Sequence, residues 1–270
     1  MLRTPFSDLF NLKHPIMNAP MSNSAGGELA AAVSNAGGLG MIGGSGSAPG
    51  MSSVEWLLRE IRLARSLTDR PFGVGFISTQ REPSSSRLRS AALQAIAIEE
   101  DITVIGHSFI VPTDLVAEAH RHRARVICQV QTIAMAHEAL TAGADVLVAQ
   151  GYDGGGHVGS IGTVSIVPAV VDIAGDVPVL AAGGIADGRG LAAALMLGAQ
   201  GANIGTRFYA SAESLIPPFM LEPLLSAGAD DTVWTRIYDL VSSADFGPTV
   251  AVRCLQNQFT LMWNGREAEA

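Results

Sequence analysis

A single histidine stands in a loop that carries few other side chains. The segment Gln150–Gly159 contains five glycines together with His157, and it directly follows an apolar run. Glycine has no Cβ, so the backbone of such a loop can approach a flat ligand closely. An imidazole beside that ligand can accept, donate or hold a proton near neutral pH. The segment predicts a site of acid–base chemistry, and the alternative is a flexible loop with a surface histidine.

Two further loops contain the residue types that bind a phosphate group. Gly183 and Gly184 follow one apolar run, and Gly205-Thr206-Arg207 follows the next. Glycine N–H groups, the amino end of a following helix and the Thr206 hydroxyl can together bind a phosphate dianion. Each loop alone also fits tight packing between a strand and a helix. Two such loops at neighbouring strand ends favour a phosphate site.

Three more positions suit a flat ring next to that phosphate. Met21, in the turn Ala19-Pro20-Met21, can lie against a ring as a polarizable contact, although a methionine there is as often part of the core. Gln129 and Gln150 end two apolar runs, and each amide can both donate and accept hydrogen bonds. These loops together would surround a ligand of about the size of flavin mononucleotide (FMN).

A repeated order of elements explains how such loops could meet. Short apolar runs alternate with longer segments of helical spacing, which is the pattern of βα units. The expected strands are His14–Asn18, Leu39–Gly43, Phe72–Ile77, Ile102–Gly106, Arg125–Gln129, Asp145–Ala149, Val177–Ala181 and Ala202–Gly205. The expected helices are Gly27–Ala36, Ser53–Ser66, Ser86–Ile98, Thr113–His122, Ile133–Ala142, Thr163–Ile173, Gly188–Leu197 and Pro217–Ser226.

Eight such units predict an α/β fold, a (β/α)8 TIM barrel with a short C-terminal helical extension. A doubly wound open sheet is the alternative, but it usually has a GxGxxG turn after its first strand, and this chain has Ala19–Ser24 there. We expect residues 1–227 to form the barrel and residues 228–270 to form an extension or lid. Ligands bind at the carboxyl ends of barrel strands, where the loops described above are expected to lie.

Composition narrows the class of protein. The chain has 270 residues, 48% of them hydrophobic and 16% charged, with a net charge of −8. An acidic chain is a poor partner for nucleic acid or an anionic membrane. We expect a cytoplasmic protein, because Cys128 and Cys254 form no CxxC pair and neither a signal peptide nor a membrane span is apparent. No metal site is expected, since no His, Cys or carboxylate cluster has ligand spacing.

The chain resembles the nitronate monooxygenase family, formerly called 2-nitropropane dioxygenases. The similarity rests on His14–Met21, Gly151–Gly159 and Ala181–Gly190 with Gly198–Phe208. It implies an FMN-dependent monooxygenase, an oxidoreductase and flavoprotein, with His157 as the catalytic residue. Together with the loops described above, it leads us to expect a cofactor site made from Ala19, Met21, Gln129, Gln150, Gly151, Gly155, Gly156, Gly183, Gly184, Gly205 and Thr206. The chain departs from the family at Gly75, where members often have Asn, and at Gln129, where some have Lys.

The reaction that the resemblance implies is the oxidation of alkyl nitronates, and of nitroalkanes, by O2 to a carbonyl compound and nitrite. A small nitro compound and O2 would be the partners. Flavin-dependent enoyl reductases share most of these motifs, so an NAD(P)H-dependent FMN reductase of an enoyl thioester or quinone is an alternative. A non-catalytic flavin- or phosphate-binding barrel is a third. A homodimer would cover apolar residues expected at the barrel rim, among them Phe208 and Phe219.

Overall fold

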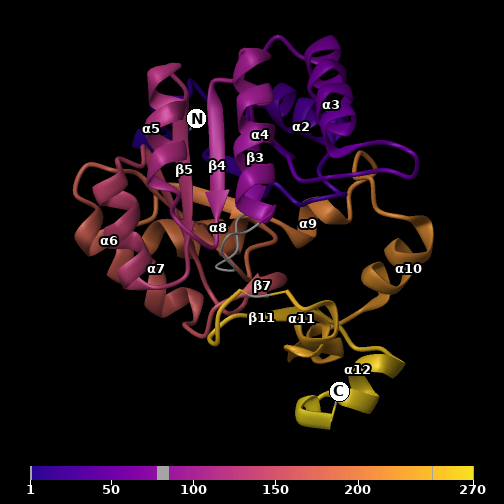
Figure 1. The fold of residues 1–270 in the computed structure, drawn as a ribbon. Coiled ribbons are helices and arrows are strands. Elements are labelled where there is room, and N and C mark those ends of the chain that lie inside the picture. Colours follow the sequence, from indigo (N-terminus) through magenta and orange to yellow (C-terminus); the bar gives the residue numbers. More distant parts are fainter. Residues whose placement is uncertain (1, 78–84, 245, 270) are drawn as a thin grey trace.

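A computed structural model of the chain describes residues 2–77, 85–244 and 246–269. Eight parallel strands form one sheet in the order β1-β9-β8-β6-β5-β4-β3-β2, and this sheet curves into a barrel with helices outside it (Figure 1). The strands are β1 (Ile16–Asn18), β2 (Gly40–Gly43), β3 (Phe72–Ile77), β4 (Val104–Ser108), β5 (Arg125–Val130), β6 (Val146–Gln150), β8 (Val179–Ala182) and β9 (Gly201–Ile204). The expected TIM barrel is therefore confirmed.

The helices follow the strands as the sequence predicts. They are α2 (Gly27–Ala36), α3 (Ser53–Leu67), α4 (Ser85–Glu99), α5 (Thr113–Arg121), α6 (Ile133–Ala142), α7 (Thr163–Ala174), α8 (Gly188–Met196) and α10 (Pro218–Ser226). The structure also has a one-turn helix that was not expected, α9 (Thr206–Tyr209), which begins directly after Gly205. Among the described helices, none is long and apolar enough to cross a membrane.

One buried asparagine closes the seam of the barrel. The end strands β1 and β2 are joined by a single parallel bridge, between Met17 and Leu39. Asn18 completes the seam, because its Nδ2 donates to the carbonyl of Met41 and its Oδ1 accepts from the Met41 N–H, each at 2.8 Å. A side chain thus makes the two hydrogen bonds that a longer β1–β2 ladder would have made. The first βα loop, which contains Ala19 and Met21, leaves the barrel from this fixed point.

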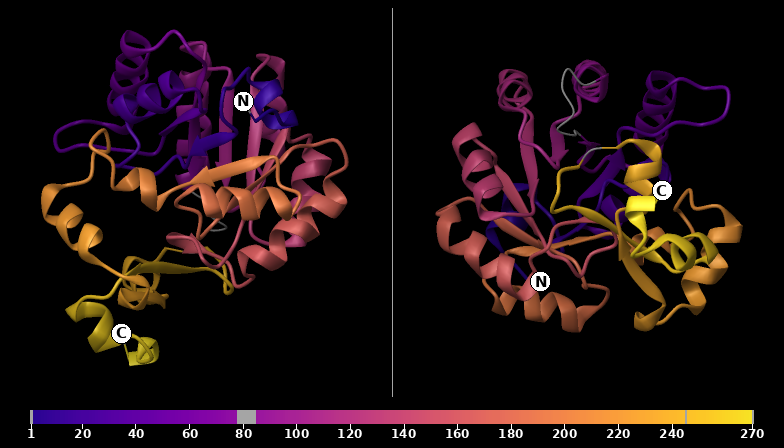
Figure 2. Two further views of the ribbon diagram at one scale, coloured as in Figure 1. Left: turned by 180° about the vertical axis from the view of Figure 1, so that it is seen from behind. Right: turned by 60° about the horizontal axis from the view of Figure 1, so that its bottom comes forward.

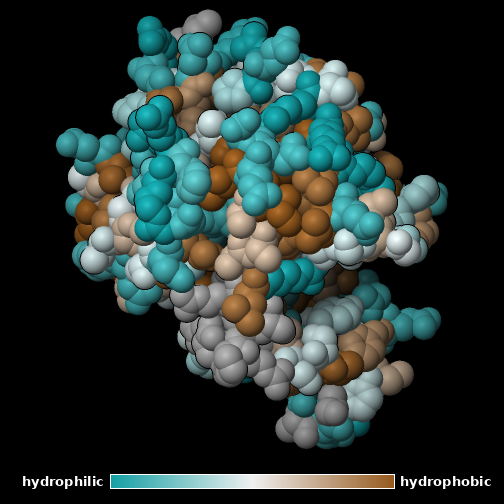
Figure 3. Space-filling view, turned by 45° about the horizontal axis from the view of Figure 1, so that its top comes forward, coloured by the Kyte–Doolittle hydropathy of each residue, from teal (hydrophilic) through white to brown (hydrophobic). Residues whose placement is uncertain are grey.

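The apolar core has two layers, one on each side of the sheet. The interior layer includes Met17, Met41, Val148 and Leu180, and Phe6 from the short helix α1 (Pro5–Leu9) packs against it. The outer layer joins the strands to the helices and consists largely of Ala, Val, Leu and Ile side chains. Hydrophilic side chains cover much of the outer surface of the helices in Figure 3, with hydrophobic ones showing between them. Helix α1 was not predicted, because five residues show no clear helical period.

The C-terminal extension contains strands as well as the expected helices. It holds η1 (Ala229–Asp231), β10 (Thr232–Thr235), α11 (Ile237–Ser242), β11 (Ala251–Leu255), α12 (Gln258–Trp263) and η2 (Glu267–Glu269). Strand β11 pairs antiparallel with β10 and also with β7 (Gly156–Val158), which belongs to the loop after β6. The extension lies at the end of the barrel toward which the strands point (Figures 1 and 2). The strands of this small sheet were not predicted, because β7 and β10 are short and pair with segments that are distant in sequence.

A buried histidine makes the stability of the fold depend on pH. His107 on β4 is 1% exposed, neither of its ring nitrogens has a hydrogen-bond partner among the described residues, and its ring lies 6.2 Å from that of Phe76. Burial lowers the pKa of His107 to about 4. The unfolded chain, in which a histidine has a pKa near 6.5, therefore binds more protons at pH values between these two pKa values.

We expect the contribution of neutral His107 to be complete above about pH 6.5 and to be lost as the pH falls toward 4. The free energy of unfolding should fall by up to about 1.4 kcal/mol per pH unit from this group. Urea unfolding at pH 7, 6 and 5 of the wild type and of His107→Leu measures it, since the variant should show a shallower slope. Equal slopes would mean that His107 does not stay neutral in the folded protein.

Candidate functional site

The loops after β6 and β9 meet directly. A Cβ added to Gly155 would lie 2.8 Å from the Thr206 Oγ1, at the start of α9. A Cβ added to Gly205 would lie 3.7 Å from the Ala19 Cβ and 3.9 Å from the Met21 Sδ. Three predicted cofactor residues from two other loops, Gly155, Ala19 and Met21, are thus neighbours of the Gly205–Thr206 turn. Gly156 lies on β7 with φ +75°, and no atom of the described residues lies within 4 Å of where its Cβ would be.

The loop after β8 contains Gly183 and Gly184, called the glycine cradle below, and it lies against the loop after β6. Gly183 has φ +108° and Gly184 has φ +72°, a left-handed region that side chains other than glycine rarely adopt. A Cβ on Gly183 would lie 2.8 Å from the Thr163 Oγ1 and 2.9 Å from the carbonyl oxygen of Gly151. The Thr163 hydroxyl donates to the Gly183 carbonyl at 3.1 Å, and this hydrogen bond ties the cradle to the start of α7. Peptide N–H groups in such a concave turn suit an anion.

An aspartate in the loop after β6 holds that loop to helix α7. The Asp153 Oδ2 accepts from the N–H of Thr163, the first residue of α7, at 2.8 Å. This hydrogen bond from the Thr163 backbone is the main reason that the pKa of Asp153 lies below its ordinary value. The carboxylate thus works within the loop, where it fixes the backbone from Gly151 to Gly154.

Three glutamines form a chain from the barrel to the histidine strand. The Gln129 Nε2 donates to the Gln150 Oε1 at 3.0 Å, and the Gln131 Nε2 donates to the same oxygen at 2.5 Å. Gln131 also donates to the carbonyl of His157 at 3.2 Å. Gln131 is buried and was not predicted as a site residue. Its signal in the sequence was only that it follows Gln129 by two residues, which places both side chains on one side of β5 and its continuation.

The imidazole of His157 is held on several sides. Its Nε2 lies 2.7 Å from the Oδ1 of Asp239, on α11 of the extension. The ring stacks on Phe246 with centroids 3.7 Å apart, and the edge of Phe109 lies 5.9 Å away. His157 keeps 25% of its side chain exposed, whereas Asp239 keeps 9%. A partly exposed imidazole with a buried carboxylate behind it is an arrangement suited to moving a proton.

Asp239, Phe246 and Phe109 were missed from sequence, and the backbone of Phe109 is unusual. Phe109 follows β4 with φ +75°, an uncommon conformation for an aromatic residue, and such strain gathers at functional sites. Its ring packs edge-on against Phe246 at 4.9 Å. The barrel and the extension thus share an apolar wall around His157.

The residues present fit a flavin, by two observations. The Gly183–Gly184 turn, which leaves no room for a Cβ on Gly183, and the Gly205–Thr206 turn contain N–H and hydroxyl groups that can donate to a phosphate. A small cavity inside the barrel mouth is lined by Asn203, Gln129 and Met41, among others, and the Oδ1 of Asn203 is buried without a partner among the described residues. An unpartnered acceptor next to an amide suits the polar edge of a flat heterocycle.

The glycine at position 75 is explained by its neighbour Pro20. A Cβ at Gly75 would lie 2.3 Å from the Pro20 Cγ, so any side chain would displace the loop that carries Ala19 and Met21. We expect Gly75→Ala to lower the free energy of unfolding by about 1–3 kcal/mol. Gly106→Ala on the next strand is the control, because its Cβ would meet its nearest atom at 3.3 Å. Urea unfolding compares them, and an equal loss in both variants would contradict the role of Pro20.

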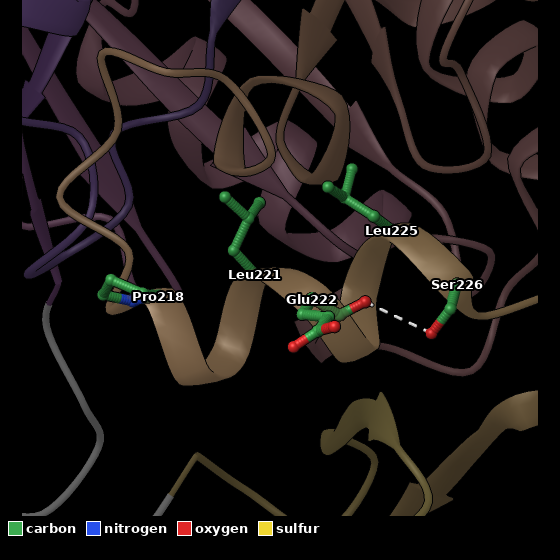
Figure 4. A pocket seen from close by; sticks show the side chains of 5 residues that line it. All are labelled: Pro218, Leu221, Glu222, Leu225 and Ser226. Atoms are coloured by element: carbon green, nitrogen blue, oxygen red, sulfur yellow. Dashed lines mark hydrogen bonds between the residues drawn. The ribbon is translucent and has the colours of Figure 1, made fainter.

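A second hollow lies away from these loops. Pro218, Leu221, Glu222, Leu225 and Ser226 line a groove along α10. Figure 4 shows Leu221 and Leu225 pointing to one side of the helix, while Ser226 bonds back to the Glu222 carbonyl. The groove holds one carboxylate and no imidazole, so it lacks the groups for the chemistry considered above.

Across the described residues, no group of three or more His, Cys, Asp or Glu could hold a metal ion.

Comparison with known proteins gives a family and several relatives. A family model described as nitronate monooxygenase matches residues 3–243. A protein of Mycobacterium tuberculosis, named (3aS,4S,5R,7aS)-5-hydroxy-7a-methyl-1-oxo-octahydro-1H-indene-4-carboxyl-CoA dehydrogenase, is 36% identical over 240 residues. That match covers 88% of this chain, and the chain spans 64% of that protein's length.

Two solved structures are similar over nearly the whole chain. FabK from Thermotoga maritima has a TM-score of 0.83 and 34% identity, and the match covers 100% of this chain and 81% of that one. Nitroalkane oxidase from Streptomyces ansochromogenes has a TM-score of 0.81 and 30% identity, over 97% of this chain and 82% of that one.

Proposed function

The chain belongs to the nitronate monooxygenase family, and from this premise we propose that it is a flavin-dependent oxidoreductase that uses FMN to oxidise alkyl nitronates with O2. The products would be a carbonyl compound and nitrite. The observation that carries the proposal is His157, partly exposed beside the glycine loops and paired with Asp239 at 2.7 Å. The pairing of His157 with Asp239 favours this function over a non-catalytic flavin- or phosphate-binding barrel.

The cofactor would be held by the loops that meet at the barrel mouth. The N–H groups of Gly183 and Gly184 and the Thr206 hydroxyl would bind its phosphate, while Ala19, Met21 and Gly205 would lie along the ring. Gln129, Gln150, Gly151, Gly155 and Gly156 would border the ring from the loops after β5 and β6. Among the described residues these two turns would form one phosphate-binding place, which favours FMN over a dinucleotide. When bound, the flavin supplies the redox chemistry, taking electrons from the substrate and passing them to O2.

His157 would act on the nitro group and on the carbon next to it. A nitronate is an anion, and a protonated imidazole can donate a hydrogen bond to its oxygens. With a neutral nitroalkane, the neutral imidazole can take the proton from that carbon. The apolar wall of Phe109 and Phe246 would exclude water from this face and contact the alkyl chain.

A second function is supported by one relative. The M. tuberculosis relative is named a carboxyl-CoA dehydrogenase, which supports redox chemistry on a CoA derivative. The form of it that we propose as the alternative is the reduction of an enoyl thioester or quinone by NAD(P)H through FMN. The same loops would then bind the flavin, and His157 would serve as a proton donor.

Anaerobic mixing separates the two functions. The flavin-loaded protein should change its flavin absorbance rapidly with propyl-2-nitronate and remain oxidised with NADH or NADPH. Rapid bleaching by a nicotinamide and none by the nitronate would favour the reductase. Release of the cofactor by denaturation, followed by chromatography, distinguishes FMN from a dinucleotide such as FAD.

A further inference from the structure

The extension contributes a buried carboxylate to a histidine that belongs to the barrel. Asp239 and His157 are 82 residues apart in sequence, yet the Oδ1 and Nε2 atoms lie 2.7 Å apart. The carboxylate is about nine-tenths buried, and within the described parts of the chain its ion pair is the one with His157. A charge buried in this way acts mainly on the group that it contacts.

One small sheet positions both side chains. Val252 on β11 pairs with His157 on β7 at one side and with Thr235 on β10 at the other. The Thr235 Oγ1 accepts from the N–H of Ile237 at 3.2 Å and so fixes the start of α11, where Asp239 lies two residues further. Thr235 and Ile237 are almost fully buried. The acid and the imidazole are thus held in one rigid unit, as precise hydrogen bonding requires.

The aromatic wall restricts the imidazole ring further. Phe246 stacks on one face and Phe109 approaches with its edge, so rotation of the ring would disturb both contacts. The ring is therefore oriented by packing as well as by the hydrogen bond. Asp239 then decides which nitrogen carries the proton, because a carboxylate is a hydrogen-bond acceptor and requires a donor at Nε2.

We propose that Asp239 is a positioning residue, which keeps His157 in the tautomer with a proton on Nε2 and leaves Nδ1 as the base for a neutral nitroalkane. The inference rests on the proposed function. In the step, the C–H bond next to the nitro group breaks and its proton moves to Nδ1. The electron pair of that bond forms the C=N bond of the nitronate, and the negative charge passes to the nitro oxygens. The resulting imidazolium stays paired with the Asp239 carboxylate.

The test compares a neutral nitroalkane with its preformed nitronate. In Asp239→Asn, kcat/KM for 2-nitropropane should fall by about tenfold to 100-fold, because the tautomer is no longer fixed. For propyl-2-nitronate, which has already lost the proton, kcat/KM should fall less than about threefold, since no base is needed. Asp239→Glu, which keeps the carboxylate, should recover part of the loss. Leu240→Ala, on the same helix at a residue 44% exposed, should leave both values unchanged.

Flavin absorbance and far-ultraviolet circular dichroism show that each variant is folded and loaded. Equal losses for both substrates in a folded Asp239→Asn would assign Asp239 a purely structural role and overturn the proposal. A wild type that oxidises the nitronate but not the nitroalkane would overturn it too, with the proposed function intact. A wild type that binds flavin but oxidises neither substrate would refute the proposed function itself.

Discussion

Replacing His157 by alanine should lower kcat/KM for a neutral nitroalkane by about 10²–10⁴-fold, the usual contribution of a general base. The imidazole is 25% exposed, stacked on Phe246 and paired with Asp239, so it is both accessible and fixed in orientation. Its removal takes away the group placed to accept the proton. Steady-state oxygen uptake with 2-nitropropane measures the loss.

Two comparisons assign that loss to chemistry. The preformed nitronate should lose less activity than the nitroalkane, because only the hydrogen bond to its oxygens is removed. His137→Ala is the matched control, since His137 is exposed on α6, outside the loops of the site. Flavin content should be the same in both variants. Turnover of the nitroalkane that is unchanged in His157→Ala would refute the role of this residue.

The second large effect is expected at the glycine cradle. Gly183→Val places a Cβ where the Thr163 Oγ1 and the Gly151 carbonyl lie within 3 Å, and it does so at φ +108°. The turn must shift, and this would displace the N–H groups that we propose bind the phosphate. Loss of two charge-assisted hydrogen bonds of about 1.5–3 kcal/mol each should weaken flavin binding by about 10²-fold to 10⁴-fold. Fluorescence quenching of FMN on titration with apoprotein measures the affinity.

Gly188→Ala controls for the replacement of a glycine in the same segment. Gly188 begins α8, and within the part of the chain that the structure describes no atom lies within 4 Å of where its Cβ would be. FMN affinity should be unchanged in this variant. Wild-type affinity in Gly183→Val would show that the phosphate lies elsewhere.

The barrel could be predicted from sequence because each βα unit is local. Every strand from β1 to β6, with β8 and β9, is a short apolar run, and small residues mark the turn before the next unit. The position of ligand loops at the carboxyl ends of strands then follows from topology. For this reason Gly155, Gly183, Gly205 and Thr206 could be assigned to one place before their distances were known.

The partners of His157 could not be predicted in the same way. Asp239 and Phe246 lie in a segment of short elements, and they reach the histidine only through the pairing of β11 with β7 and β10. No local pattern encodes that pairing. Phe109 was hidden for a different reason, since its strained φ of +75° is a property of the folded loop. The cofactor loops were thus local in sequence, while the groups that orient the imidazole were not.

Oxygen consumption and nitrite release by the flavin-loaded protein, given propyl-2-nitronate without any nicotinamide, test the central claim most directly. We expect rapid oxygen uptake with nitrite formed from the substrate, and little of either from apoprotein. A protein that retains bound flavin yet consumes no oxygen with the nitronate would contradict nitronate oxidation.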